Sequence, residues 1–231
     1  MAGHRARGPD DDLLIRHLWS ALGCPTPTLP PMDHRDWDDR YREKGGLLWT
    51  AEPNRFVVEV VEGLTPGTVF DLAGGHARNA VWLAERGWDP TMVDWSEVAI
   101  EQGAALAAER GVTVHFERAD LLEWEPSRPA DLVLVVYLQI PAEQRQRVWV
   151  VAASAVAPGG TLAIIGHDSS NLSEGFGGPQ DHRVLYTAEE VAATIGADLT
   201  VTRADRVERP VEMEDGMHVA LDNVVVAMRE S

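Results

Sequence analysis

Two apolar runs that each end in an acid, with a turn of small residues between them, constrain this sequence most. The first run ends at Asp71 and leads into Ala73-Gly74-Gly75, and the second ends 23 residues later at Asp94. A strand, a glycine turn and an amphipathic helix are typical of a nucleotide-binding loop, because glycine lets a ligand approach the backbone. The second acid is placed to accept hydrogen bonds from ribose hydroxyls. The pattern predicts a site for an adenosine-containing cofactor.

The turn differs from those that bind phosphate groups. Dinucleotide-binding turns follow the pattern G-x-G-x-x-G, whose sixth position holds a small residue beside the pyrophosphate. When the pattern is counted from Ala73, the sixth position is Arg78. The turn also lacks the lysine and hydroxyl pair of a P-loop. An adenosyl cofactor without phosphates is therefore favoured, and an NAD enzyme is a distant alternative.

The segment Asp71–Ala77 resembles the first strand and turn of the class I S-adenosylmethionine-dependent methyltransferases. The following segment Arg78–Gly87, together with Trp37–Tyr41, Trp49 and Pro53–Phe56, is similar to the tellurite-resistance and thiopurine-type small-molecule branch. The likeness covers roughly residues 36 to 230. It implies S-adenosyl-L-methionine as the cofactor and a Rossmann-like, three-layer α/β/α sandwich with a mostly parallel seven-stranded sheet and a C-terminal antiparallel strand.

Alternating apolar and amphipathic segments after Gly67 predict the same α/β architecture, with helices on both faces of a mostly parallel sheet. We expect strands at Val69–Asp71, Pro90–Asp94, Val112–Glu117, Asp131–Tyr137 and Thr161–His167, and helices at Arg78–Arg86, Glu97–Arg110, Ala142–Ala157 and Ala188–Ile195. The last two apolar runs, Leu199–Val207 and His218–Met228, have no crossover helix between them and should pair antiparallel.

The length of 231 residues, 45% of them hydrophobic, suits one methyltransferase domain over residues 36–231, preceded by an N-terminal helical arm or lid over residues 1–35. In that arm, Asp10–Leu22 has helical spacing of its apolar residues. A lid, an arm that packs on a second subunit of a homodimer, and a plain surface helix all fit this segment.

The charge balance limits the partners. Thirty-seven acids against twenty Lys and Arg give a net charge of −17, which repels nucleic acid and anionic membranes. We therefore expect a small-molecule acceptor, no nucleic acid and no membrane partner. The single cysteine, Cys24, and the lack of a signal-peptide core predict a cytoplasmic location.

Ligands of open α/β sheets lie beyond the carboxyl ends of the strands. The cofactor residues expected there, from strand ends and from the family resemblance, are Asp71, Ala73, Gly74, Gly75, Asn79, Asp94, Trp95, Ser96, Asp120, Leu121 and Val136. Asp120 has the alternative role of a turn cap. The resemblance further implies an aromatic cover by Trp37, Tyr41, Trp49 and Phe56, and Arg42 or Arg78 near the methionine carboxylate.

The catalytic candidates are His167, Tyr137 and Asp168, which end or follow the expected fourth and fifth strands. Methyl transfer to a hydroxyl needs alignment and removal of a proton, so His167 is the preferred general base, oriented by Asp168 or another nearby acid. Packing and loop capping are the alternatives. No metal site is expected: Tyr137 stands where metal-assisted catechol-type enzymes supply an aspartate, and the acids at 33, 36, 38 and 39 suit a solvated helix start.

The sequence therefore predicts a small-molecule methyltransferase, with O-methylation of a sugar or specialised metabolite preferred. The polar, glycine-rich segment Ser169–Arg183 is a candidate loop for recognising a polyhydroxylated acceptor, or a lid that recognises nothing. A thiol or tellurite-type detoxifying methyltransferase and a non-catalytic adenosyl-binding module are the alternatives.

Overall fold

The structure is a computed structural model that describes residues 34–43 and 50–231. Within these ranges the strands form one seven-stranded sheet in the order β3-β2-β1-β4-β5-β7-β6. The strands are β1 (Thr68–Leu72), β2 (Asp89–Asp94), β3 (His115–Arg118), β4 (Ala130–Val136), β5 (Val156–His167), β6 (Thr200–Met213) and β7 (Gly216–Met228). β7 pairs antiparallel with β5 and β6, and the other pairs are parallel. The predicted Rossmann-like sheet with an antiparallel end is confirmed.

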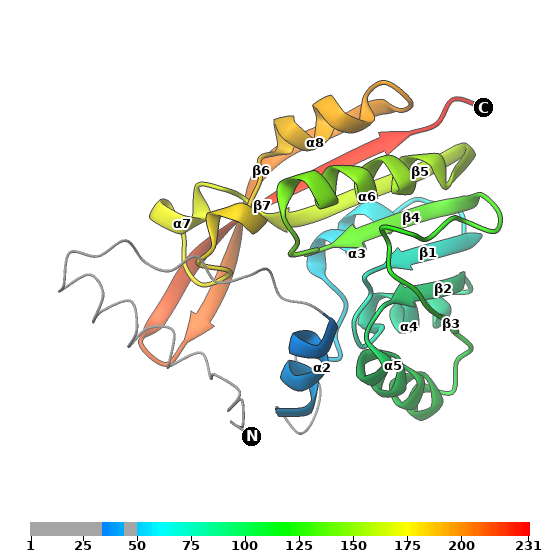
Figure 1. Cartoon of the computed structure of the whole chain (residues 1–231), viewed down its shortest axis with the longest axis horizontal. Coiled ribbons are helices and arrows are strands. Elements are labelled where there is room, and N and C mark those ends of the chain that lie inside the picture. The colour runs from blue at the N-terminus through cyan, green and yellow to red at the C-terminus, as the bar shows by residue number, and fades with distance from the viewer. Residues whose placement is uncertain (1–33, 44–49) are drawn as a thin grey trace, which may run out of the picture.

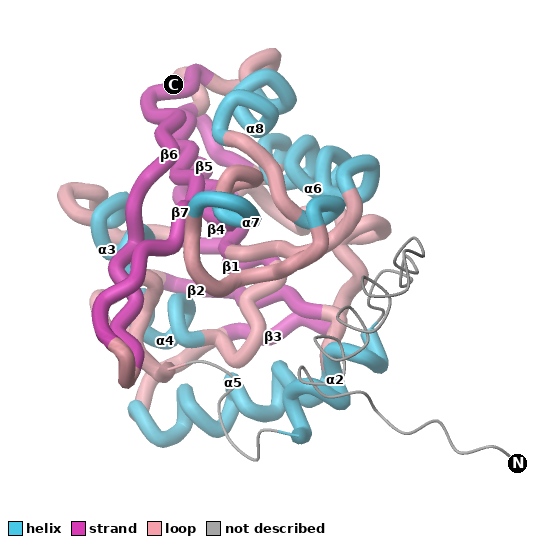
Figure 2. Tube along the Cα trace, turned by 90° about the vertical axis from the view of Figure 1, so that its left-hand side faces the viewer, coloured by secondary structure: helices cyan, strands magenta, loops and turns pink. Residues whose placement is uncertain are grey.

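Helices cover both faces of this sheet (Figures 1 and 2). α3 (Arg55–Val61), α4 (Arg78–Ala84) and α5 (Glu97–Arg110) lie on one face, and α6 (Ala142–Ser154) and α8 (Ala188–Ile195) on the other. Neighbouring residues of a strand face opposite sides, so Val69 packs beneath α3 and α4 while Phe70 packs beneath α6 and α8. This double burial explains why the central strands are continuous apolar runs.

Some helix ends follow local sequence signals, and α5 is the clearest example. Ser96 caps α5 by accepting a hydrogen bond from the Ala99 amide, and Gly111 ends the helix with a φ of 66°. α6 is shorter than predicted, because the chain turns at Ala155 to begin β5 at Val156. β3 also begins later than predicted, since the amide of Val112 still bonds the Ala107 carbonyl of α5.

Further helical segments are α2 (His34–Glu43), α7 (Asn171–Glu174) and the short 3₁₀ helix η1 (His182–Val184). The predicted helix Asp10–Leu22 and Trp49 lie outside the described residues. None of the helices in the described part of the chain is long and apolar enough to cross a membrane.

The β6–β7 hairpin runs past the carboxyl end of β5 (Figure 1). The last residue of β5, His167, pairs with Asp222, so the hairpin from residue 200 to 228 carries its turn beyond the sheet. The loop after β5 is fastened to this extension, because the Phe176 ring stacks on His218 at 4.0 Å between ring centroids and Asn171 accepts a hydrogen bond from the Leu221 amide. Hairpin and loop together form a wall beside the strand ends.

Candidate functional site

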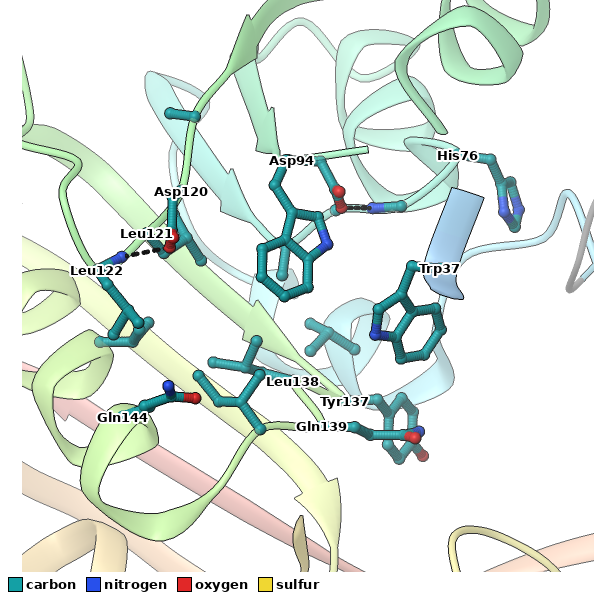
Figure 3. Close-up of a pocket in the computed structure, with 18 of the residues that line it drawn as sticks. Trp37, His76, Asp94, Asp120, Leu121, Leu122, Tyr137, Leu138, Gln139 and Gln144 are labelled. Atoms are coloured by element: carbon teal, nitrogen blue, oxygen red, sulfur yellow. Dashed lines mark hydrogen bonds between the residues drawn. The ribbon is translucent and has the colours of Figure 1, made fainter. Parts of the chain in front are cut away.

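A cavity of about 300 Å³ opens at the carboxyl ends of the parallel strands. It brings together, among the predicted cofactor residues, Ala73, Gly74, Gly75, Asn79, Asp94, Trp95, Asp120, Leu121 and Val136. Figure 3 shows Asp120 on one side of the cavity and Trp37 and His76 on the other, with Asp94 above and Tyr137 below. The pocket therefore lies where an open α/β sheet binds its ligand.

Asp94 is held in place by the backbone around it. Its Oδ2 accepts a hydrogen bond from the Gly75 amide at 2.9 Å, and its Oδ1 accepts one from the Ser96 amide at 2.9 Å. Burial raises the pKa of Asp94, and these amide hydrogen bonds oppose the rise. Each carboxylate oxygen has a second lone pair, so both remain able to accept from a ligand hydroxyl.

The turn after β1 is tight and locally strained. Ala73 and Ala77 adopt φ angles of 54° and 61°, a conformation that favours glycine, and Gly75 has a φ of 59°. At Gly74, an added Cβ would lie 2.5 Å from Cγ of Met92, so only glycine fits without movement of its neighbours. The turn thereby keeps its backbone close to the cavity.

Asp71 does not line the cavity but lies fully buried below the turn. Burial raises the pKa of Asp71 to about 7, while the Ala80 amide and the nearby Arg78 charge lower it. A Cβ added at Gly74 would lie 3.0 Å from Oδ2 of Asp71, so this carboxylate packs against the turn and does not reach the cavity.

Arg78 lines the cavity as an incompletely buried cation. Burial lowers the pKa of its guanidinium, and the neighbouring Tyr137 and Asp71 raise it. Within residues 34–43 and 50–231, no carboxylate lies within ion-pair distance of Arg78. A ligand carboxylate is the partner that such a guanidinium fits best.

Helix α2 contributes Trp37 and Tyr41 to the lining of the cavity. It is attached to α5, because Ser96 Oγ donates a hydrogen bond to Asp38 and Gln102 donates one to the Tyr41 carbonyl. Ser96 thus positions α2 and α5 rather than lining the cavity itself.

Arg42, the other arginine proposed for the methionine carboxylate, is not brought to the cavity. Its side chain is 57% exposed and pairs with Asp38 and Asp39 on its own helix. The i, i+3 and i, i+4 spacing explains this pairing. Arg78 is therefore the arginine that the structure places at the pocket.

Sequence reasoning missed several lining residues, of which Gln144 and Val148 of α6 are the clearest. They are four residues apart and so lie on one face of the helix. Helical periodicity could have grouped these two residues, but it does not show that their face lines the cavity. His76 lines the same cavity, and its Nε2 lies 3.2 Å from the Thr50 carbonyl oxygen.

His167 lies beside the cavity rather than in its lining. Its ring packs on Tyr137, which does line the cavity, at 4.6 Å between ring centroids. Nδ1 of His167 is 3.0 Å from Oδ1 of Asp222. Asp168 instead accepts hydrogen bonds from the amide and hydroxyl of Ser170. The acid that contacts His167 therefore comes from β7, not from the next residue in sequence.

Of the acids at 33, 36, 38 and 39, Asp33 and the side chain of Asp36 lie outside the described residues, and the other two have partners of their own. Asp38 accepts from Ser96, and Asp39 pairs with Arg42. Among the residues that the structure describes, no group of three or more His, Cys, Asp or Glu side chains could hold a metal ion.

Residues 69–160 match the family described as a methyltransferase domain. This segment, which is less than half of the chain, is similar to a methyltransferase domain. The matched segment includes β1, the glycine turn and Asp94, the features from which this domain was predicted. S-adenosylmethionine is accordingly the cofactor of the domain, and the cavity fits it: Gly74 leaves the close approach open, Asp94 offers acceptors and Arg78 offers a cation.

A relative from Mycobacteroides abscessus, named 2-heptyl-1-hydroxyquinolin-4(1H)-one methyltransferase, is 29% identical over 134 residues. The match covers 56% of this chain and 59% of the length of the relative.

Two of the solved structures that match this chain show that its fold is shared with other proteins. One, from work on the conversion of a disulfide bond into a thioacetal group in echinomycin biosynthesis, has a TM-score of 0.67 at 20% identity and covers 85% of this chain and 92% of its own. The other, the N-methyltransferase NodS from Bradyrhizobium japonicum with S-adenosyl-L-homocysteine, has a TM-score of 0.63 at 15% identity and covers 87% and 100%.

Proposed function

We propose that this chain transfers a methyl group from S-adenosylmethionine to an oxygen of a small molecule, such as a sugar or specialised metabolite. One observation carries the proposal: a single cavity contains Asp94 and the glycine turn and extends to Tyr137, which packs on His167. The residues proposed to bind the cofactor therefore share one cavity with Tyr137, and the His167 imidazole packs on Tyr137 beside that cavity.

The residues at the cavity have separate roles in this proposal. Asp94 accepts the ribose hydroxyls, the Asp120–Leu121 segment contacts the adenine, and Arg78 pairs with the methionine carboxylate. When bound, S-adenosylmethionine supplies an electrophilic methyl group on a sulfonium sulfur. Trp37 and Tyr41 of α2 cover this region and exclude water from it.

On the acceptor side, His167 takes the proton from the acceptor hydroxyl on Nε2. Bound S-adenosylmethionine would supply the methyl group that this oxygen accepts, and the proton would remain on the imidazole. A neutral hydroxyl is a weak nucleophile, so a positioned base contributes roughly 10²- to 10⁴-fold to the rate. The named acceptor of the mycobacterial relative carries a hydroxyl group, which supports an oxygen acceptor here.

Methylation of sulfur is the second candidate. The structural neighbour from echinomycin biosynthesis comes from work on the conversion of a disulfide bond into a thioacetal group, and this sulfur chemistry supports the second candidate. A thiol is more acidic and more nucleophilic than a hydroxyl, with a few per cent already thiolate at about pH 7, so this reaction would depend less on His167.

The decisive experiment offers the purified chain S-adenosylmethionine and matched acceptors that carry a hydroxyl, a thiol or an amine on the same scaffold. We expect methyl ethers by mass spectrometry, and a kcat lowered roughly 10²- to 10⁴-fold by His167→Ala with unchanged binding of S-adenosylhomocysteine. The control His115→Ala removes an exposed histidine of β3 and should leave turnover intact.

Two outcomes would contradict the proposal. Methylation of the thiol alone, at equal rates in His167→Ala, would assign the chain to sulfur chemistry. Tight binding of S-adenosylhomocysteine without any methylated product across the panel would favour an adenosyl-binding module.

A further inference from the structure

We propose that Asp222 is a positioning residue of the acceptor side, which holds the His167 imidazole with Nε2 as its proton-accepting atom. Arg209 and Tyr137 hold the Asp222 carboxylate in turn. The inference rests on the proposed base role of His167 and extends it to residues of β4, β6 and β7.

The pairing of the strands sets this contact. His167 of β5 and Asp222 of β7 are directly opposite each other in the antiparallel ladder. The Cβ atoms of such a pair lie about 5 Å apart on one face of the sheet. Asp168, one residue later, is directed to the other side of the backbone, because successive side chains of an extended chain alternate. Register therefore selects Asp222 over Asp168 as the partner of His167.

Asp222 is fully buried and accepts three hydrogen bonds. Its Oδ1 is 3.0 Å from His167 Nδ1, while its Oδ2 accepts from the Tyr137 hydroxyl at 2.7 Å and from Arg209 Nε at 2.6 Å. Burial by itself raises the pKa of Asp222, but the hydrogen bonds from His167 and Arg209 bring that pKa below its ordinary value. The carboxylate is therefore ionised at neutral pH.

An ionised carboxylate fixes the tautomer of the histidine. It has no proton to donate, so the hydrogen in the contact belongs to Nδ1 of His167 and the lone pair belongs to Nε2. In the described part of the chain, Nε2 has no hydrogen-bond partner. The imidazolium formed after proton transfer would face Oδ1 of Asp222 at 3.0 Å, while Arg209 neutralises the other oxygen.

Tyr137 and the loop after β5 restrict rotation of the imidazole. Burial raises the pKa of the Tyr137 phenol, so Tyr137 keeps its proton and acts as a donor to Asp222 rather than as a base. Its φ of 56° is strained for a tyrosine, and its amide bonds the Ile165 carbonyl at 2.7 Å. From above, a Cβ added to Gly178 would lie 3.2 Å from Nδ1 of His167, so the loop backbone packs closely on the ring.

Nitrogen-15 NMR of histidine tests the inference on the whole chain, with the His167 signals assigned by their loss in His167→Gln. We expect the neutral imidazole of the wild type to carry its proton on Nδ1. In Asp222→Asn, the amide oxygen stays with Arg209 and Tyr137 and the amide nitrogen faces His167, so the proton should move to Nε2. We expect kcat to fall roughly 10²- to 10⁴-fold, with KM and S-adenosylhomocysteine binding unchanged.

The control is Asp215→Asn. It removes the carboxylate of the other His–Asp contact on the hairpin, where Asp215 lies 2.8 Å from His218 at the exposed turn. This variant should leave both the His167 signals and kcat as in the wild type.

The outcomes separate the two proposals. A wild-type His167 that carries its proton on Nε2 would overturn the role of Asp222 whatever the turnover, and this measurement needs His167→Gln only to assign the signals. An Asp222→Asn chain that folds and retains kcat would also overturn it. An Nδ1 proton in a wild type that methylates no acceptor supports the Asp222 contact but contradicts the proposed function.

Discussion

The backbone amide of Gly75 donates a hydrogen bond to Oδ2 of Asp94 at 2.9 Å, which ties the turn after β1 to the carboxylate at the end of β2. The two most informative features of the sequence are thus one structural unit. Since backbone groups direct both oxygens of Asp94, the carboxylate is oriented before any ligand arrives. A preorganised acceptor loses less entropy on binding than a mobile one.

Replacement of this carboxylate should weaken binding of the cofactor. Asp94→Asn keeps the size of the side chain but loses acceptor capacity and charge, and we expect roughly 10- to 100-fold weaker binding of S-adenosylhomocysteine by calorimetry. Asp89→Asn, at the exposed start of the same strand, is the matched control and should bind as the wild type does. Equal affinity of the two variants would remove Asp94 from the site.

The two arginines considered for the methionine carboxylate can be distinguished with a truncated ligand. Arg78→Met should reduce the affinity for S-adenosylhomocysteine roughly 10- to 100-fold, because hydrogen bonds to charged groups contribute about 1.5–3 kcal/mol. It should leave the affinity for 5′-methylthioadenosine, which lacks the carboxylate, nearly unchanged. Arg42→Met, on the exposed side of α2, should change neither affinity. Equal losses for both ligands in Arg78→Met would refute the assignment.

Asp71 should make stability depend on pH. The ordinary pKa of an aspartate is 3.8, and burial raises the pKa of Asp71 to about 7 in the folded protein. The folded state therefore binds this proton more tightly than the unfolded state does. The stabilisation is complete below the ordinary pKa and is lost as the pH rises through about 7. Between these values the contribution falls by about 1.4 kcal/mol per pH unit. Urea unfolding should show that Asp71→Asn gains stability relative to the wild type over this range.

The control for this titration is Asp131→Asn. Hydrogen bonds from Thr68 lower the pKa of Asp131, so its contribution is lost only on acidification. Its stability difference from the wild type should be flat from about pH 5 to 8. A flat difference for Asp71→Asn as well would show that Asp71 does not titrate there.

The left-handed alanines of the turn should respond to glycine in the opposite way from a helical alanine. At Ala73, with a φ of 54°, glycine relieves backbone strain, and we expect a gain of roughly 0.5–1 kcal/mol in unfolding free energy. At Ala80, inside α4, the same change should cost about 1 kcal/mol. Ala77→Gly should gain less than Ala73→Gly, because its methyl group is fully buried. Thermal unfolding of the three variants checks the order.

The sequence predicted the strands, several helices and the glycine turn beside Asp94, because short stretches of neighbouring residues determine each of these features. The helix Glu97–Arg110 was predicted with its observed bounds, since Ser96 and Gly111 punctuate it. α3 was missed: it is a single short helix whose cap, Asn54, is recognisable only once its hydrogen bonds to the Phe56 and Val57 amides are known. Propensity alone is weak for such a segment.

The acceptor side was less accessible to sequence reasoning. The register of β5, β7 and β6 places Asp222 opposite His167 and brings Arg209 to Asp222. The spacing of these residues in the sequence does not predict which of them are paired. A residue that follows His167 in sequence was the natural candidate, yet alternation along the strand directs it elsewhere. Register depends on the fit of the whole hairpin, which is a non-local property.

The position of Asp222 on β7 also has a consequence in time. A chain that is still emerging from the ribosome contains Gly74 and Asp94 long before it contains Asp222. The residues proposed to hold the methyl donor are thus synthesised early. The contact between His167 and Asp222 forms only after β7 has paired between β5 and β6. In the function proposed above, a nascent polypeptide of this sequence would contain the residues that hold the nucleoside before it contains those that orient the base.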